Sequence, residues 1–283
     1  MNSDAFFSMG KTHEVCQDYA RSGEIEGRQF AVVSDGCSSS PDTDFGARFL
    51  TMATIQGRKK FPSKLLKAEW VIWHAEDIVK RYGLSPYCLD ATLLAILPAI
   101  EKGFNVHVCG DGAVIVGNMD GSFDMWDFDC AGAPSYLSYL LDEDRLASYY
   151  EAGFGTWKVT HYKRLPGCSD WREIPEPDYE PDDLPLKFGS EHPYIRWCVE
   201  PERDEVSFIM VVSDGIHSFQ KADTLQSVPI QEVANHLIDF KSFTGQFVTR
   251  RCRAFEKFCI KEGWHHNDDL GVAAVYTGGN DEE

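Results

Sequence analysis

The pentapeptide VVSDG occurs twice in this sequence, about 180 residues apart, and each copy closes an apolar run with the composition of a β-strand. The first copy ends in Asp35-Gly36 and the second in Asp214-Gly215. A carboxylate followed by glycine after such a run predicts a side chain at the strand's end, where the backbone must turn sharply. The repetition favours a fold in which the two strand ends serve one site.

Two weaker relatives of this motif lie elsewhere in the chain. Asp111 stands between two glycines after the run 104–109, and Asp268-Asp269 precedes the run 270–276. The four positions can meet only if their strands are neighbours in one folded unit. Oxygen ligands without nearby paired Cys or His favour magnesium or manganese over zinc or copper, so the four motifs together predict a hard-cation site. Taken one at a time, each motif is explained as well by ordinary turn chemistry.

Composition limits the classes of partner. The chain has 283 residues, 43% of them hydrophobic, and can bury a sizeable core in one large domain or two ordinary ones. Its formal net charge of -18 argues against nucleic acid and against an anionic membrane surface, and favours neutral or basic partners.

Targeting signals and disulfide patterns are both missing from the sequence. The N-terminus has no basic segment followed by an apolar core, and no stretch approaches the length of a membrane span, so we expect a cytoplasmic protein. The nine cysteines are scattered without a Cys-x-x-Cys pair. Reduced and buried thiols are therefore predicted, above all for Cys109, Cys252 and Cys259, which lie inside apolar runs.

The β signals of the first half come in two groups. Residues 5–34 predict a short strand, a loop over 9–17 and a hairpin that turns near Gly23 or Gly27. Between 90 and 128, short apolar runs are separated by Gly, Asn or charged pairs. This spacing predicts an antiparallel meander with strands over 91–97, 104–109, 113–117 and 122–128.

Amphipathic patterns predict two pairs of helices. The first helix follows the polar loop 37–43 and places Phe45, Phe49 and Met52 on one face, and the second runs from Ser63 to Gly83 with Trp70 and Trp73 in the core. The second pair follows the second VVSDG. Its predicted buried stripes are Ile230, Val233, Ala234, Leu237 and Ile238 in one helix, and Val248, Cys252, Phe255 and Cys259 in the other, which ends at Gly263.

One segment interrupts these patterns. Residues 170–205 contain six of the thirteen prolines and twelve Asp or Glu against four Lys or Arg, so they cannot bury enough apolar surface to form core. We interpret 165–205 as an acidic insertion, either a solvated excursion, which is favoured, or a mobile flap beside the site. The expected organisation is one domain over 1–276 and a disordered tail over 277–283.

The order of the motifs resembles a known family. His13-x-x-Cys16-Gln17-Asp18, Asp35-Gly36, Asp90-Ala91-Thr92, Gly110-Asp111-Gly112, Ser213-Asp214-Gly215 and Asp268-Asp269 together resemble the metal-dependent phosphatases of the protein phosphatase 2C family, in its bacterial branch. The resemblance spans about residues 8 to 276. It implies an α+β fold, in which a β-sandwich of two antiparallel sheets is flanked by helix pairs, and a binuclear magnesium or manganese centre in the cleft between the sheets.

The resemblance also implies roles for individual residues. Asp35 would bridge two ions, the Gly36 carbonyl would complete the second ion's shell, and Asp214 and Asp268 would hold the first. Asp111 would approach a third, weaker ion. Asp18 would hydrogen-bond a metal-bound water and, with Asp35 and Asp214, would form the catalytic set. A hydroxide between the ions would attack phosphorus in line with the Ser or Thr oxygen, without a phosphoenzyme.

Several positions depart from the family's pattern. Cys37 replaces a His proposed to protonate the leaving group, and Ser218 replaces a carboxylate expected at a third ion. His13 replaces an Arg that grips phosphate, and a neutral imidazole grips more weakly. Asp269 replaces an Asn, and Gln17 stands where Glu is frequent. His13 is alternatively an ordinary surface or structural histidine, and Asp18 alternatively a turn cap.

The leading interpretation is a serine/threonine phosphoprotein phosphatase that opposes a kinase. One alternative is a pseudophosphatase that keeps the phosphopeptide cleft and binds without turnover, which the departures at positions 13, 37 and 218 motivate. The other is a phosphohydrolase of small metabolites. Manganese-dependent hydrolysis of an aryl phosphate separates the first reading from the second, and a panel of phosphopeptides and nucleotides separates the first from the third.

Overall fold

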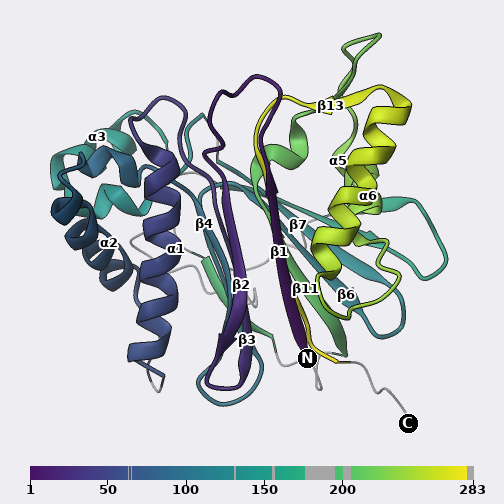
Figure 1. Cartoon of the computed structure of the whole chain (residues 1–283), viewed down its shortest axis with the longest axis horizontal. Coiled ribbons are helices and arrows are strands. Elements are labelled where there is room, and N and C mark those ends of the chain that lie inside the picture. The colour runs from purple at the N-terminus through teal and green to yellow at the C-terminus, as the bar shows by residue number, and fades with distance from the viewer. Residues whose placement is uncertain are drawn as a thin grey trace.

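The computed structural model describes residues 1–62, 64, 66–130, 132–154, 157–175, 195–199 and 205–278. Two β-sheets, antiparallel at every described pairing of strands, pack face to face, and helices cover the outer face of each (Figure 1). The predicted α+β architecture, a sandwich of two antiparallel sheets between layers of helices, is confirmed.

The two sheets differ in size. The larger has the strand order β1-β14-β11-β6-β7-β8-β9. In chain order its strands are β1 (Asn2–Ser8), β6 (Gly112–Asn118), β7 (Phe123–Cys130), β8 (Trp157–Arg164), β9 (Trp171–Ile174), β11 (Val206–Val212) and β14 (Leu270–Tyr276). The smaller has the order β10-β5-β4-β3-β2. Its strands are β2 (Tyr19–Ile25), β3 (Arg28–Ser34), β4 (Leu93–Pro98), β5 (Phe104–Cys109) and β10 (Ile195–Val199), and a separate pair joins β12 (Phe219–Lys221) to β13 (Trp264–His266).

Helices form the outer layers. The helices packed on the smaller sheet are α1 (Thr43–Lys60) and α2 (Ala68–Tyr82), and those packed on the larger sheet are α5 (Ile230–Ile238) and α6 (Phe247–Glu262). A further helix, α3 (Glu143–Glu151), lies on the same side of the molecule as α1 and α2 (Figure 1). The short 3-10 turns are η1 (Pro86–Leu89), η2 (Leu137–Leu141) and η3 (Asp214–His217).

The two VVSDG strands are buried on both faces. Along β3, Val32 packs toward α1 and α2, whereas Val33 packs into the core between the sheets. Along β11, Val212 packs toward α5 and α6, whereas Val211 faces the same central core. Because successive side chains of a strand point to opposite faces, a strand between two apolar layers reads as a continuous apolar run.

Most of the helix predictions hold, with corrections in the first pair. The predicted stripes of α5 and α6 are buried, and α6 ends at Gly263. The second helix begins at Ala68, and Ser63 lies outside the described residues. Trp73 is 60% exposed and Phe45 48% exposed, so neither is core. The buried stripe of α2 runs through Val71, Ile72, Ala75 and Val79, which turns position 73 toward solvent.

The predicted meander over 91–128 is wrong as a single sheet. The β4–β5 hairpin belongs to the smaller sheet and the β6–β7 hairpin to the larger. The chain crosses between the sheets at Gly110-Asp111-Gly112, where Gly110 has φ of 90°. A β-carbon on Gly112 would lie 2.6 Å from the carbonyl oxygen of Val212, so the crossing needs glycine for close approach as well as for its turn.

The acidic segment is partly structured. Its described parts include β9 and β10, which pair at the edges of the two sheets, so 165–205 is not wholly an excursion from the fold. The rest of it, 176–194 and 200–204, lies outside the described residues, as does 279–283 of the predicted tail. The described cysteines are free thiols, and Cys109, Cys252 and Cys259 are buried as predicted. No described helix has the length and apolar character needed to cross a bilayer.

Candidate active site

The predicted carboxylates gather at one end of the sandwich. Asp18 directly precedes β2 and Asp35 directly follows β3, and Tyr19 pairs with Ser34 in the register of these antiparallel strands. In the other sheet, Asp214 follows β11 and Asp269 precedes β14, and the Ser213 amide donates to the Gly271 carbonyl at 3.0 Å. Antiparallel pairing therefore brings each start of a strand beside an end of its neighbour.

A side-chain hydrogen bond joins the two sheets at this end. The Ser213 hydroxyl donates to Asp18 Oδ2 at 2.6 Å, and the Gly271 amide donates to that hydroxyl at 2.8 Å. Asp18 is 1% exposed. Because its partner comes from the larger sheet, Asp18 is a contact between the sheets, which the turn-cap alternative does not explain.

The charges of these carboxylates act on one another. Burial raises the pKa of Asp18 to about 7, and the nearby charge of Asp214 raises it too. Burial, followed by the charges of Asp18 and Asp214, raises the pKa of Asp35 well above its ordinary value. Burial and the charge of Asp268 raise the pKa of Asp214. Burial and the charge of Asp214 raise the pKa of Asp111 to about 7. Five predicted residues are therefore close enough to interact.

The donor set fits a hard cation. Within the described part of the chain, one buried oxygen each of Asp18, Asp111 and Asp214 has no hydrogen-bond partner. Buried unpaired carboxylate oxygens are costly, and a divalent cation would satisfy them and relieve the mutual repulsion. Among the described residues, no group of three or more His, Cys, Asp or Glu side chains is arranged to hold a metal ion.

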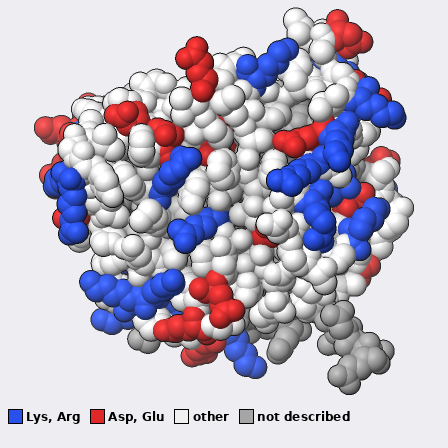
Figure 2. All heavy atoms as spheres, viewed as in Figure 1, with Lys and Arg blue, Asp and Glu red and all other residues white. Residues whose placement is uncertain are grey.

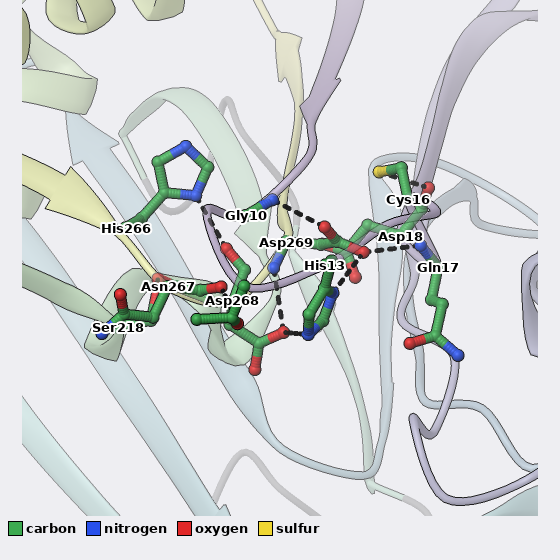
Figure 3. Close-up of polar contacts among 12 residues, drawn as sticks. Gly10, His13, Cys16, Gln17, Asp18, Ser218, His266, Asn267, Asp268 and Asp269 are labelled. Carbon is green, nitrogen blue, oxygen red and sulfur yellow. Dashed lines mark hydrogen bonds and ion pairs between the residues drawn. The ribbon is translucent and has the colours of Figure 1, made fainter.

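His13 lies against the two aspartates that precede β14 (Figure 3). Its Nδ1 is 3.0 Å from Asp269 Oδ2, and its Nε2 is 3.4 Å from Asp268 Oδ1. Burial lowers the pKa of His13, but the adjacent carboxylate of Asp269 outweighs this effect and raises the pKa above the ordinary value. These contacts are compatible with a structural role for His13 as well as with a role in the site, and its Nε2 faces Asp268, the more exposed of the two aspartates.

Asp269 fixes the loop that carries His13. Its carboxylate accepts from the Gly10 amide at 2.7 Å and from the Gln17 amide at 2.5 Å, and its side chain is 1% exposed (Figure 3). An Asn at this position has a single acceptor oxygen, whereas both oxygens of Asp accept. The replacement of the expected Asn therefore matches the donors that this loop presents.

Gln17 links this loop to the first VVSDG turn. Its carbonyl accepts from the Gly36 amide at 3.2 Å, and its side-chain Nε2 donates to Thr43 Oγ1 at 2.6 Å. A β-carbon on Gly36 would lie 2.7 Å from the Thr43 carbonyl oxygen. Only glycine leaves room for this packing, which holds the Gly36 backbone at the site.

The Asp35 turn rests on a charged clamp that the sequence did not reveal. Asp90 is 1% exposed and accepts from both terminal guanidinium nitrogens of Arg145, at 2.8 and 2.6 Å. It also accepts from the hydroxyls of Ser138 at 2.6 Å and Ser40 at 2.7 Å. The Asp90 carbonyl in turn accepts from the Cys37 amide at 2.8 Å. The clamp therefore ties η2 and α3 to the loop that carries Asp35.

Two of the departing residues have local partners. Ser218 Oγ donates to the Gly215 carbonyl at 2.8 Å, which closes the η3 turn. Cys37 Sγ lies 3.0 Å from Ser39 Oγ, and it is half-buried. Burial raises the pKa of the Cys37 thiol, but hydrogen bonds from Ser39 and Tyr136 outweigh this and lower it.

The sequence matches a known protein family. The profile of the family described as Protein phosphatase 2C matches residues 8–250. The chain belongs to the protein phosphatase 2C family. A search of curated proteins gives no match.

Bacterial phosphatases are among the solved structures of similar fold. One is a bacterial serine phosphatase, 11% identical with a TM-score of 0.52 over 99% of each chain. Another is the PPM Ser-Thr phosphatase MsPP from Mycobacterium smegmatis in complex with cacodylate, 14% identical with a TM-score of 0.51 over 98% of this chain and 99% of that one. At these identities the likeness shows the protein phosphatase 2C fold, and the roles of individual residues rest on the geometry above.

Proposed function

We propose that this member of the protein phosphatase 2C family is a magnesium- or manganese-dependent phosphatase that acts on phosphoserine or phosphothreonine in proteins. One observation carries the proposal: buried carboxylates with unpaired oxygens come from both sheets to one end of the sandwich. Without a cation such a cluster destabilises the folded state, because buried like charges repel one another.

The proposed ligands follow the residues that converge. Asp35, the Gly36 carbonyl, Asp214 and Asp268 would hold two ions, and Asp111 is the candidate for a third. When bound, the ions supply positive charge for a phosphate dianion and lower the pKa of water. Ser218 hydrogen-bonds the Gly215 carbonyl, so the third position has one fewer acidic side chain than the family's pattern provides.

Asp18 and His13 take the remaining roles. Asp18 has one oxygen fixed by Ser213 and the other without a hydrogen-bond partner in the described structure, so it can accept a hydrogen bond from water and orient it. His13 is the candidate phosphate contact through Nε2. This nitrogen lies 3.4 Å from Asp268 Oδ1, whereas Nδ1 lies 3.0 Å from Asp269 Oδ2, so Nε2 is the less closely held of the two ring nitrogens. His13→Ala should then raise KM for a phosphopeptide, and His13→Arg should restore it.

The test is manganese-dependent hydrolysis of an aryl phosphate, followed by a panel of phosphopeptides and nucleotides. Turnover of phosphopeptides that disappears in Asp35→Asn supports the proposal.

The pseudophosphatase remains a second candidate because His13 and Ser218 are held by protein groups and Cys37 replaces an acid. Phosphopeptide binding without turnover at saturating manganese would establish it in place of the phosphatase. Preference for nucleotides would establish a metabolite phosphohydrolase.

A further inference from the structure

A cavity lies on the α6 side of the larger sheet, and its lining includes Leu270, which directly follows Asp269. Its volume is about 440 Å³, and its floor is formed by aromatic side chains, among them Phe219, Phe255 and Trp264. Ile260 and Met9 stand at its rim. Cavities of this size and apolar character are typical of binding sites for small ligands or for single large side chains.

The rim exposes more apolar surface than its surroundings. Ile260 is 80% exposed, the largest exposed fraction of any large hydrophobic residue in the described chain, and Met9 is 50% exposed. Single exposed apolar residues are common, but two at the mouth of an apolar cavity form a continuous surface. We call this surface, with the cavity and the basic stripe described next, the α6 groove.

A stripe of positive charge runs along α6 beside the cavity. Arg250, Arg253, Lys257 and Lys261 follow one another at helical spacings of three and four residues, which places them on one face. Figure 2 shows Lys and Arg side chains gathered over this helix. Arg253 and Lys257 have no ion-pair partner among the residues that the structure describes. The stripe contrasts with the net charge of -18 for the chain.

We infer that the α6 groove binds an acidic segment of a partner protein that places one large apolar side chain in the cavity. Charge complementarity identifies the occupant. Arg253 and Lys257 attract carboxylates to this surface, although the chain as a whole, with its net charge of -18, repels acidic groups. The cavity and Ile260 supply the apolar anchor that such interfaces use. Glu256, which also lines the cavity, opposes the binding of acidic groups.

A membrane fits this surface less well than a peptide does. An anionic bilayer would meet the basic stripe but would also be repelled by a chain of net charge -18. A peptide segment covers only the stripe and fills the cavity. The inference does not depend on the proposed phosphatase activity, since it rests on α6 and its neighbours alone.

The experiment measures direct binding without metal or substrate. The probe is a short fluorescent peptide rich in Glu with one central Leu, and its anisotropy is followed on titration with the whole protein. Versions with the Leu replaced by Ser, or with the Glu residues replaced by Gln, should bind more weakly. Binding should weaken with added salt, because screening shortens the reach of charges to about 3 Å at 1 M.

Substitutions at different positions of α6 should change the affinity in opposite directions. Lys257→Glu should weaken binding on the order of fivefold and Ile260→Ser by about tenfold, whereas Glu256→Gln should strengthen it. Lys59→Glu is the matched control, since it makes the same charge change at an exposed position on α1, in the opposite outer layer (Figure 1). It should change binding by less than about twofold. Thermal melts check that each variant folds.

Four results would overturn the inference. The first is absence of binding by every acidic peptide, and the second is equal loss in Lys257→Glu and Lys59→Glu, which would mean unspecific attraction. The third is binding of anionic lipid vesicles without binding of the peptides. The fourth is self-association of the protein, seen by sedimentation and abolished by Ile260→Ser, which would make a second copy the occupant.

Discussion

The two VVSDG turns share five residues, but their serine side chains have different hydrogen-bond partners. In the first, the Ser34 hydroxyl donates to the Thr92 carbonyl at 2.6 Å, inside its own sheet. In the second, the Ser213 hydroxyl donates to Asp18 across the sandwich. The local sequence therefore determines a strand and a turn, and the neighbours determine whether the same serine stabilises one sheet or joins two.

The supports of the two aspartates differ in the same way. The Asp35 turn combines close backbone packing at Gly36 with a side-chain support, because Asp90 and Arg145 tie its loop to α3. The Asp214 turn depends on backbone: a β-carbon on Gly215 would lie 1.7 Å from the Asp269 carbonyl oxygen, so the η3 turn packs directly on the start of β14. We expect the first turn to be the more sensitive to distant mutations and the second to be the more rigid.

The largest expected effect is the loss of activity when either Asp35 or Asp214 is replaced. Asp35→Asn and Asp214→Asn should each lower metal-dependent hydrolysis by about 100-fold or more, because removing a ligand costs at least as much as removing its hydrogen-bond partner. If Asp35 bridges two ions and Asp214 holds one, excess manganese should restore part of the activity of Asp214→Asn and little of Asp35→Asn. Steady-state rates across a manganese titration measure this.

The exposed turn residue Asp120 gives the control for that titration, since Asp120→Asn removes a carboxylate remote from the cluster. Activity near the wild-type level in either Asp35→Asn or Asp214→Asn, at saturating metal, would remove both residues from the proposed site.

The next effect tests the clamp. Arg145→Ala leaves Asp90, which is 1% exposed, as a buried charge without its cation and should lower the free energy of unfolding by about 3 kcal/mol. Arg145→Lys should recover part of it, because one ammonium cannot make both contacts of the guanidinium. Urea unfolding gives the stability, and manganese affinity by calorimetry shows whether the Asp35 loop has shifted.

Arg81→Ala is the matched control, because Arg81 pairs with Asp77 on the surface of α2 and should contribute less than about 0.5 kcal/mol. If Arg145→Ala weakens manganese binding no more than Arg81→Ala does, the clamp stabilises the fold without positioning the turn.

The fold and the clamp show the limits of sequence reasoning. Strand ends at Asp35 and Asp214, and the buried stripes of α5 and α6, follow from patterns within a few residues, and they were predicted correctly. The Asp90 and Arg145 pair is separated by 55 residues and has no local pattern. The division of the expected meander between two sheets was missed for a similar reason. A short glycine turn has the same local sequence whether the chain stays in one sheet or crosses to the other.

The third prediction uses the pH dependence of the metal-free protein. Burial raises the pKa of Asp18 and Asp111 to about 7, so between their unfolded values and about pH 7 the folded state binds more protons than the unfolded state. Stability should therefore fall as pH rises through that window, the reverse of a salt-bridged aspartate. Melting temperatures should drop by several degrees from about pH 5.5 to 8, and manganese should remove most of the drop. A melting temperature that rises over this window, or that manganese leaves unmoved, would contradict the buried cluster.

The smallest effect compares the two serines directly. Ser34→Ala removes a neutral hydrogen bond and should cost about 1 kcal/mol at any pH. Ser213→Ala removes a donor to a carboxylate, for which about 1.5–3 kcal/mol is typical, and it also removes an interaction that lowers the pKa of Asp18. The cost of Ser213→Ala should therefore be larger above about pH 7, where Asp18 is ionised, and smaller at about pH 5.5, where it is protonated. Urea unfolding of both metal-free variants at the two pH values measures the difference, with Ser34→Ala as the reference that accounts for general effects of pH. Equal costs at both pH values for Ser213→Ala would mean that Ser213 does not act through the charge of Asp18. Both VVSDG serines would then contribute to stability only as neutral hydrogen-bond donors.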